Sequence, residues 1–200
     1  MRIIGGEYRS RLISMPKGVE IRPTQDKVRE AIFNILGDIS DKNVLELFAG
    51  SGAFGIECLS RGARYAAFVD NNGRCVDTIK TNLESLGIPG SKYDVIRANA
   101  LSVLARLEKE EVKYDLIFLD PPYYKNIARK CLINIDSYDI LTQIGLVIIE
   151  HFKKDKLVLD LNSLVFEKER RYGDTLISIF RRKAPEGHEQ GKDSGLPGEF

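Results

Sequence analysis

Short apolar segments alternate with helical segments along most of this chain, and that alternation restricts its fold more than any other feature. Five of the apolar segments are expected to be strands: 44–48, 65–69, 93–97, 114–119 and 145–150. The expected helices end near 61 or span 74–86, 100–110 and 127–135. This spacing predicts an α/β fold in which helices cover both faces of a mostly parallel sheet. Two late segments, 164–170 and 175–181, are joined by a hairpin-like turn, so the last strand should run antiparallel.

The segment before this alternation is expected to form a hairpin arm at 1–20 and a leading helix at 24–37. In the arm, two apolar pairs flank a polar stretch that carries Gly5 and Gly6. Thr24 is a natural N-cap for the helix, and Gly37 closes it. With a core at 43–183, residues 1–183 are expected to form a single domain. Residues 184–200 are rich in glycine, proline and charge, which predicts a disordered tail.

Composition excludes several classes of protein. No stretch approaches the roughly 18 apolar residues that cross a bilayer, and the first residues lack the apolar core of a signal peptide. We therefore expect a cytoplasmic protein without membrane contact. Cys58, Cys75 and Cys131 have neither disulfide nor zinc spacing, so we expect buried or half-buried thiols and no metal. His151, which follows a strand, is expected to be a surface or capping residue.

Charge is unevenly distributed although the net charge is only +1. Residues 1–29 hold seven Lys or Arg against three Asp or Glu. Such a basic segment can contact a phosphate backbone, but an ordinary solvated surface explains it equally well. The candidates for RNA contact are Arg9, Arg11, Arg22 and Arg29. Arg22 could instead border a cofactor pocket.

A glycine-rich turn follows the first expected strand, at the edge where open α/β sheets bind ligands. Gly50 and Gly52 allow a tight turn, and with Gly55 they also match the dinucleotide pattern G-x-G-x-x-G. Glu46, inside the strand, can accept a hydrogen bond from a cationic amino group. S-adenosylmethionine carries such a group and a dinucleotide does not. The turn therefore favours S-adenosylmethionine.

Asp70 ends the second expected strand, 18 residues after Gly52. A carboxylate at this position can accept hydrogen bonds from both hydroxyls of a ribose. Dehydrogenases use the same arrangement, so Asp70 indicates a nucleoside cofactor and no more. The alternative is that Asp70 caps the helix that follows it.

The run Asp120-Pro121-Pro122-Tyr123 ends the fourth expected strand. Two successive prolines stiffen the backbone and remove two amide donors. The Pro121 carbonyl and the Asp120 carboxylate can then accept both hydrogens of a planar amino group, while Tyr123 stacks on the ring that bears it. The quartet resembles the (Asp/Asn/Ser)-Pro-Pro-(Tyr/Phe/Trp) motif of amino-group methyltransferases. The target base must be single-stranded, in a loop, or flipped out of a helix.

Four blocks extend this resemblance to nearly the whole chain: RIIGGEYRSRLI, RPTQDKVREAIFNIL, LELFAGSGAFGIE and FLDPPY. Together they resemble the bacterial small-subunit (16S) rRNA guanine-N2 methyltransferases of the RsmD type. The resemblance implies a Rossmann-like class I methyltransferase fold with a seven-stranded sheet, an N-terminal β-hairpin near the RNA and a helix. It also implies S-adenosylmethionine as methyl donor, S-adenosylhomocysteine as product, and ribosomal RNA or the assembling small subunit as partner.

The same resemblance assigns roles to individual residues. Methionine-end contacts are implied for Glu46, Phe48, Gly50 and Gly52. Asp70 would hold the ribose, while Asn99 and Ala100 would flank the adenine. Asp120, Pro121 and Tyr123 would act on the base.

Other functions stay open at this stage. An adenine-N6 methyltransferase acting on DNA or RNA would use the same quartet. A nicotinamide or flavin oxidoreductase explains the glycine turn but not the quartet, and a non-catalytic RNA-binding protein would need only the basic arm. Nothing demands more than a monomer.

Overall fold

The apolar segments form one mixed sheet in the computed structural model, which describes residues 1–19, 26–122, 126–155, 157 and 160–184. The strands are β1 Asn43–Leu47, β2 Tyr65–Asp70, β3 Tyr93–Arg97, β4 Tyr114–Leu119, β5 Leu141–Phe152, β6 Leu164–Tyr172 and β7 Thr175–Arg182. Their order is β3-β2-β1-β4-β5-β7-β6, and β7 runs antiparallel to both of its neighbours. The predicted α/β fold class, with seven strands and an antiparallel last strand, is confirmed.

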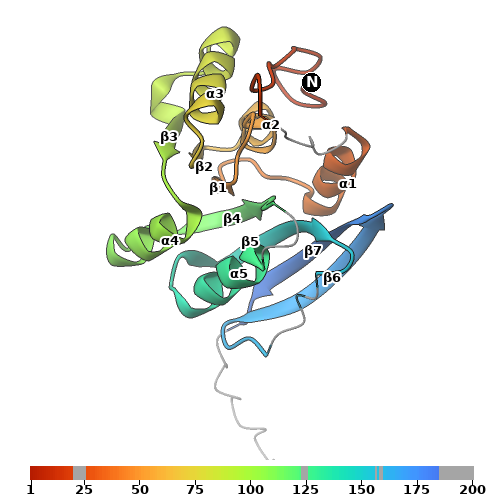
Figure 1. Ribbon diagram of the computed structural model, residues 1–200, viewed down its shortest axis with the longest axis vertical. Coiled ribbons are helices and arrows are strands. Elements are labelled where there is room, and N and C mark those ends of the chain that lie inside the picture. Colours follow the sequence, from red (N-terminus) through yellow and green to blue (C-terminus); the bar gives the residue numbers. More distant parts are fainter. Residues whose placement is uncertain (20–25, 123–125, 156, 158–159, 185–200) are drawn as a thin grey trace, which may run out of the picture.

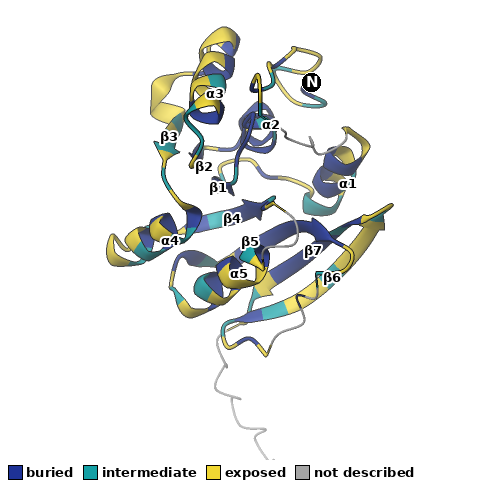
Figure 2. Cartoon of the chain, in the orientation of Figure 1, coloured by how far each residue is buried: buried dark blue, intermediate teal, exposed yellow. Residues whose placement is uncertain are grey.

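Helices cover both faces of this sheet (Figure 1). They are α1 Asp26–Leu36, α2 Ala53–Ser60, α3 Gly73–Leu86, α4 Ala100–Lys109 and α5 Ile127–Ser137, and a short 3-10 turn, η1, spans Gly90–Lys92. Alternate side chains of β4 enter different cores: Leu116 and Phe118 meet α1–α3, while Ile117 and Leu119 meet α4 and α5. Burial on both faces explains why the central strands are continuous apolar runs (Figure 2).

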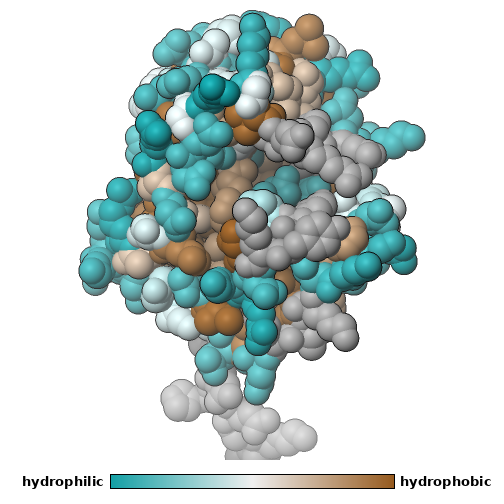
Figure 3. Space-filling view, in the orientation of Figure 1, coloured by the Kyte–Doolittle hydropathy of each residue, from teal (hydrophilic) through white to brown (hydrophobic). Residues whose placement is uncertain are grey.

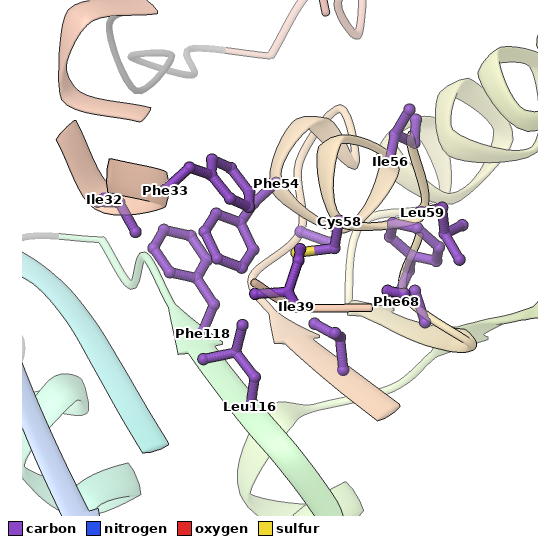
Figure 4. Close-up of a cluster of buried hydrophobic side chains, with 14 of the residues drawn as sticks. Ile32, Phe33, Ile39, Phe54, Ile56, Cys58, Leu59, Phe68, Leu116 and Phe118 are labelled. Carbon is purple, nitrogen blue, oxygen red and sulfur yellow. The ribbon is translucent and has the colours of Figure 1, made fainter. Parts of the chain in front are cut away.

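Three phenylalanine rings join the leading helix to the sheet. Phe33 of α1 stacks on Phe54 of α2 with ring centroids 5.1 Å apart, and Phe54 stacks on Phe118 of β4 at 4.0 Å (Figure 4). The guanidinium of Arg61 lies 4.4 Å from the centre of the Phe33 ring. Because Phe118 is two residues before Asp120, this stack fixes α1 and α2 beside the end of β4.

The N-terminal segment forms the expected hairpin, reduced to a single antiparallel bridge between Arg2 and Leu12. Ile3 and Ile13 are buried in the core beneath α1–α3. The predicted end of α1 is also confirmed, since Gly37 has φ +66° and its N–H bonds to the Phe33 carbonyl. Thr24 lies outside the described residues. All three cysteines are buried, as expected.

The strand β5 begins four residues before its predicted start. Its first residues are partly exposed to solvent. Thr142 is half-buried while Gln143 and Ile144 are exposed, so this part lacks the apolar run that marked the strand. A register shift against β4 occurs in the same region. None of the helices that the structure describes is long and apolar enough to span a membrane.

Candidate active site

The strand order reverses between β1 and β4, and this is where open α/β sheets bind ligands. β1 pairs with β2 on one side and with β4 on the other, so the chain leaves these strands in opposite directions. In Figure 3 hydrophilic side chains cover most of the periphery, whereas hydrophobic ones gather near the middle of the visible face, where β1 and β4 lie in Figure 1. The residues predicted for the cofactor and the base lie in or directly after the last residues of β1, β2, β3 and β4 at this edge.

The glycine turn contains three residues in the left-handed region. Phe48, Gly50 and Gly52 have φ values of +60°, +58° and +75°, and the Gly52 N–H bonds to the Ala49 carbonyl at 2.7 Å. For glycine this conformation costs little, whereas for Phe48 it costs about 1–2 kcal/mol. Such strain concentrates at functional sites. The turn brings backbone amides to the start of α2, where they can face an anionic or polar ligand group.

Glu46 caps α2 from within β1. Its buried carboxyl group accepts the N–H of Gly55 at 2.9 Å and that of Phe54 at 3.3 Å. The helix has no capping side chain at Gly52, so Glu46 satisfies two of the amides left free at its start. Burial raises the pKa of Glu46 to about 8. Its contact with a ligand amino group stays a prediction.

Gly55 is required by packing rather than by backbone conformation. A Cβ at this position would lie 2.4 Å from Cε1 of Phe68 on β2 and 2.9 Å from Oε2 of Glu46. The last glycine of the G-x-G-x-x-G pattern thus lets α2 approach the sheet closely. This need is common to dinucleotide and S-adenosylmethionine proteins, so the pattern alone does not separate them.

Asp70 holds the glycine turn against the end of β2. Its carboxylate accepts the N–H of Gly50 and the N–H of Asn72, each at 2.9 Å. The N-cap of α3 is Asn72, whose side chain accepts the Arg74 N–H, so the alternative that Asp70 caps this helix is wrong. The half-buried carboxylate also contacts the Cys75 thiol, and its contact with ribose hydroxyls stays a prediction.

Asn99 and Ala100 start α4 next to Asp70. The Ala98 N–H bonds to the Asp70 carbonyl at 3.1 Å, which brings the end of β3 beside the end of β2. Asn99 is the N-cap, and its side-chain oxygen accepts the Leu101 N–H at 2.9 Å. Ala100 is buried. The expected adenine contact stays a prediction, and the amide oxygen of Asn99 would have to serve both partners.

Asp120 and Pro121 follow β4 directly. Leu47 of β1 and Leu119 of β4 are register partners, so Phe48 and Asp120 leave their strands at the same level. Asp120 is half-buried, Pro121 is buried and Pro122 is exposed. Tyr123 lies outside the described residues. The arrangement sets a carboxylate on a stiff loop beside the strained glycine turn.

The candidate RNA-binding arginines differ in their surroundings. Arg9 and Arg11 are exposed, and Arg11 donates to the Ser85 carbonyl at 3.0 Å. Arg22 lies outside the described residues. Arg29 is a correction: its side chain is only 1% exposed and donates to the Arg2 carbonyl and to Asp26. A guanidinium enclosed in this way supports the arm from within and cannot reach a nucleic acid.

Comparison with known proteins agrees with this geometry. The family described as "Conserved hypothetical protein 95" matches residues 1–181. The chain belongs to this family. It is 37% identical over 184 residues to the Bacillus subtilis protein named "Putative rRNA methyltransferase YlbH", covering 92% of this chain and all of the relative. The Escherichia coli "Ribosomal RNA small subunit methyltransferase D" is 30% identical over 185 residues, covering 92% of this chain and 91% of the relative.

A solved structure extends the family likeness to three dimensions. The protein described as "Putative methyltransferase yhhF from Escherichia coli" superposes with a TM-score of 0.80 at 29% identity, covering 92% of this chain and 99% of that chain. The predicted resemblance to the RsmD type is confirmed, and so is the Rossmann-like methyltransferase fold. Among the residues that the structure describes, no group of three or more His, Cys, Asp or Glu is arranged to hold a metal ion.

Two buried polar residues that hold the N-terminal arm in place were not identified from the sequence. Glu57 of α2 accepts the N–H groups of Ile4 and Gly5 at 2.8 and 2.7 Å and so fixes the arm. Asn82 of α3 donates to the carbonyls of Ser14 and Ser51, tying the arm to the glycine turn. Both residues interrupt apolar stripes of their helices, and that interruption is the sequence signal that could have found them.

Proposed function

We propose that this protein transfers a methyl group from S-adenosylmethionine to the exocyclic N2 amine of a guanine in small-subunit ribosomal RNA. One observation carries the proposal: Asp120 and Pro121 leave β4 at the level where the strained glycine turn leaves β1. The cytoplasm, where ribosomes assemble, is the expected location, and a monomer suffices for the reaction.

The residues at the glycine turn fit S-adenosylmethionine better than they fit a dinucleotide. Asp70 is oriented by two backbone amides, and a carboxylate held in this way can accept hydrogen bonds from ribose hydroxyls. Glu46 is a buried carboxyl group with a raised pKa, which a neighbouring cationic amino group would stabilise as the anion. S-adenosylmethionine supplies an electrophilic methyl group on a sulfonium and carries that amino group.

The end of β4 supplies acceptors for the nucleophile. A guanine amino group is a poor nucleophile, because its lone pair is delocalised into the ring. The Asp120 carboxylate and the Pro121 carbonyl would accept its two hydrogens and turn its lone pair toward the methyl group. Positioning and preorganised dipoles of this kind provide most of the rate enhancement in such sites. The proposed step needs no strong base at the amine.

Small-subunit RNA is supported by the names of relatives, and guanine by the resemblance of the sequence blocks to guanine-N2 methyltransferases, rather than by the described geometry. The Escherichia coli relative is named as a small-subunit rRNA methyltransferase, and the match covers 91% of its length. The exposed Arg9 and Arg11 give the arm positive charge for a phosphate backbone. The acceptors at Asp120 and Pro121 would serve an adenine N6 amine equally well, so the modified nucleoside has to be identified directly.

The test incubates the purified protein with methyl-labelled S-adenosylmethionine and small ribosomal subunits from cells that lack the enzyme. The RNA is then digested and the labelled nucleoside is identified. We expect N2-methylguanosine. N6-methyladenosine would keep the chemistry but contradict the base, and the absence of label from small-subunit RNA would contradict the substrate. Free small-subunit RNA, assayed in parallel, decides whether proteins of the subunit are needed.

We further predict that binding of S-adenosylhomocysteine releases a proton. Glu46 has a pKa of about 8 in the free protein, so it is mostly protonated at pH 7. A ligand ammonium group favours the carboxylate and lowers this pKa, so up to one proton leaves on binding. Affinity should therefore rise as pH increases toward about 8. Calorimetry in buffers of different ionisation enthalpy measures the proton directly.

A ligand without the amino acid provides the control for this measurement. Methylthioadenosine has the same nucleoside but no ammonium group, so its binding should release no proton at pH 7. Equal proton release for both ligands would contradict a contact between Glu46 and the amino group. This comparison leaves the α2 cap intact, which a substitution of Glu46 would not.

A further inference from the structure

A row of polar side chains crosses the sheet from β5 to the edge strand β6. Nε2 of His151 lies 2.8 Å from Oγ of Ser178, and this Oγ lies 2.9 Å from Oε2 of Glu169. His151 and Ser178 are each 1% exposed, whereas the Glu169 side chain is 43% exposed. His151 is therefore not the surface residue that was expected. The row connects the interior of the sheet to solvent.

The inner end of the row lies near the two prolines that follow β4. Leu119 and Ile149 are register partners, and Pro121 and His151 each come two residues later on these neighbouring strands. Pro121, Pro122 and His151 line the same small cavity of about 10 Å³, together with the charged residues Arg129 and Asp155. A cavity of that size has room for about one water molecule. The imidazole and the two prolines that follow β4 therefore border the same space.

The outer end of the row opens into a larger hollow. Ser178 and Glu169 line a cavity of about 520 Å³ on the face of β6 and β7, together with Lys153, Asp155 and Lys183. Leu157, Phe166 and Phe180 supply part of its apolar wall. A proton that reaches Glu169 is therefore at an exposed carboxylate. It can leave for solvent without crossing the core.

Counting hydrogens shows that the row can hold one more proton than its neutral form carries. Three contacts lie along the row, in addition to a hydrogen bond from the ring to the Asp155 backbone: Nδ1 of His151 with the Phe152 carbonyl at 3.2 Å, Nε2 with Ser178, and Ser178 with Glu169. A neutral imidazole and a hydroxyl supply only two hydrogens, and an ionised Glu169 supplies none. One contact therefore lacks a hydrogen in either tautomer. A single added proton, making His151 an imidazolium, completes all three.

The groups around His151 act in opposite directions on its charge. Burial lowers the pKa of His151, and this is the dominant effect. The Phe152 carbonyl, the Glu169 carboxylate 4.0 Å away, and Asp155 partly offset that effect by favouring the imidazolium. At neutral pH the resting row is therefore without its extra proton. The neutral imidazole of His151 can therefore accept a proton beside the loop that follows β4.

We propose that the row of His151, Ser178 and Glu169 accepts the proton released by methyl transfer and passes it to solvent. The inference rests on the proposed function. In the reaction the bond from sulfur to the methyl carbon breaks and a bond from carbon to nitrogen forms, leaving a secondary ammonium on the base. That ammonium loses one proton across the small cavity to His151. Glu169 is the counter-ion of the imidazolium and the group from which the proton leaves.

The first test measures the imidazole itself and needs no activity. The chain has two histidines, so His188→Gln leaves the nitrogen resonances of His151 alone in an NMR titration. In this background Glu169→Gln is expected to lower the pKa of His151 by about one unit, the effect of a removed neighbouring charge. Glu167→Gln is the control, because Glu167 is an exposed residue of the same strand that pairs with Arg181. Equal pKa values of His151 in the two variants would overturn the proposed coupling between His151 and Glu169.

The second test links the row to turnover. At low pH the imidazole of His151 is already protonated and cannot accept a proton from the amine. The value of kcat should therefore fall as pH decreases through the pKa of His151. Glu169→Gln should move this acid limb to lower pH by the shift seen in NMR, and Glu167→Gln should not. His151→Gln should abolish the limb and lower kcat about tenfold, less than a group acting directly on the substrate. A purely structural role would lower kcat without moving the limb, and that result would overturn the proposal.

The two tests separate this inference from the proposed function. Failure to methylate any RNA would contradict the proposed function, while the NMR titration would still decide whether the row holds a shared proton. In another outcome, Glu169→Gln lowers the pKa of His151 as expected, but neither Glu169→Gln nor His151→Gln changes the acid limb of kcat. That outcome would not contradict methyl transfer. It would overturn the role of the row in turnover.

Discussion

Replacing Asp120 with alanine should lower kcat for RNA methylation about 10³-fold, the upper range for loss of one preorganised hydrogen-bonding group. Asp120 follows β4 at the level of the glycine turn. In the proposed complex the amine donates hydrogen bonds to Asp120 and Pro121, and these bonds orient it. Without the carboxylate, one amine hydrogen has no acceptor and the lone pair is no longer directed at the methyl group. The Kd of S-adenosylhomocysteine should change less than about threefold, since the glycine turn and Asp70 are untouched. Single-turnover kinetics and calorimetry measure the two quantities separately.

Asp120→Asn is the matched variant for this prediction. An asparagine keeps one side-chain oxygen as acceptor but cannot take up a proton, so a positioning role predicts a loss of only about tenfold. If Asn is as inactive as Ala, the carboxylate acts as a base and the proton does not need His151. Normal turnover in Asp120→Ala would remove Asp120 from the mechanism altogether.

Hydrophobic pattern was sufficient for the strands that are buried on both faces. β2 and β4 lie within a residue of their predicted bounds, because continuous apolar runs between turn residues have few alternatives. The first part of β5 escaped prediction because its exposed residues carry no such run. The insertion of β7 between β5 and β6 was likewise not predictable. Turn residues determine that two strands pair, whereas their place in the sheet depends on which edge is free.

Site prediction succeeded where backbone geometry dictates residue type and failed where burial decides. Gly50 and Gly52 are needed at positive φ, and that need is visible in sequence. Arg29 follows Val28, and with Ile32 it lies on the buried stripe of α1, so its helical position contradicted the charge-based assignment. His151 appeared to be an ordinary strand end because its partners, Ser178 and Glu169, belong to strands far along the chain.

Replacing Asp70 with alanine should raise the Kd of S-adenosylhomocysteine about 100-fold. Hydrogen bonds to a charged group contribute about 1.5–3 kcal/mol each, and about 2.8 kcal/mol corresponds to a factor of 100. The substitution also leaves the N–H groups of Gly50 and Asn72 without their acceptor, so part of the loss could arise from the turn itself. Asp77→Asn, an exposed acidic residue one turn into α3, controls for the change in charge and should leave Kd unaltered.

A ligand analogue separates the two contributions at Asp70. S-adenosylhomocysteine without its ribose hydroxyls cannot bond to the carboxylate, so it should bind weakly to the original protein and lose little more in Asp70→Ala. The difference between the two losses is then the coupling between the carboxylate and the hydroxyls. If both ligands lose affinity equally, Asp70 acts only through Gly50 and the shape of the turn. The ribose contact would then be wrong, although the carboxylate would still be essential to the site.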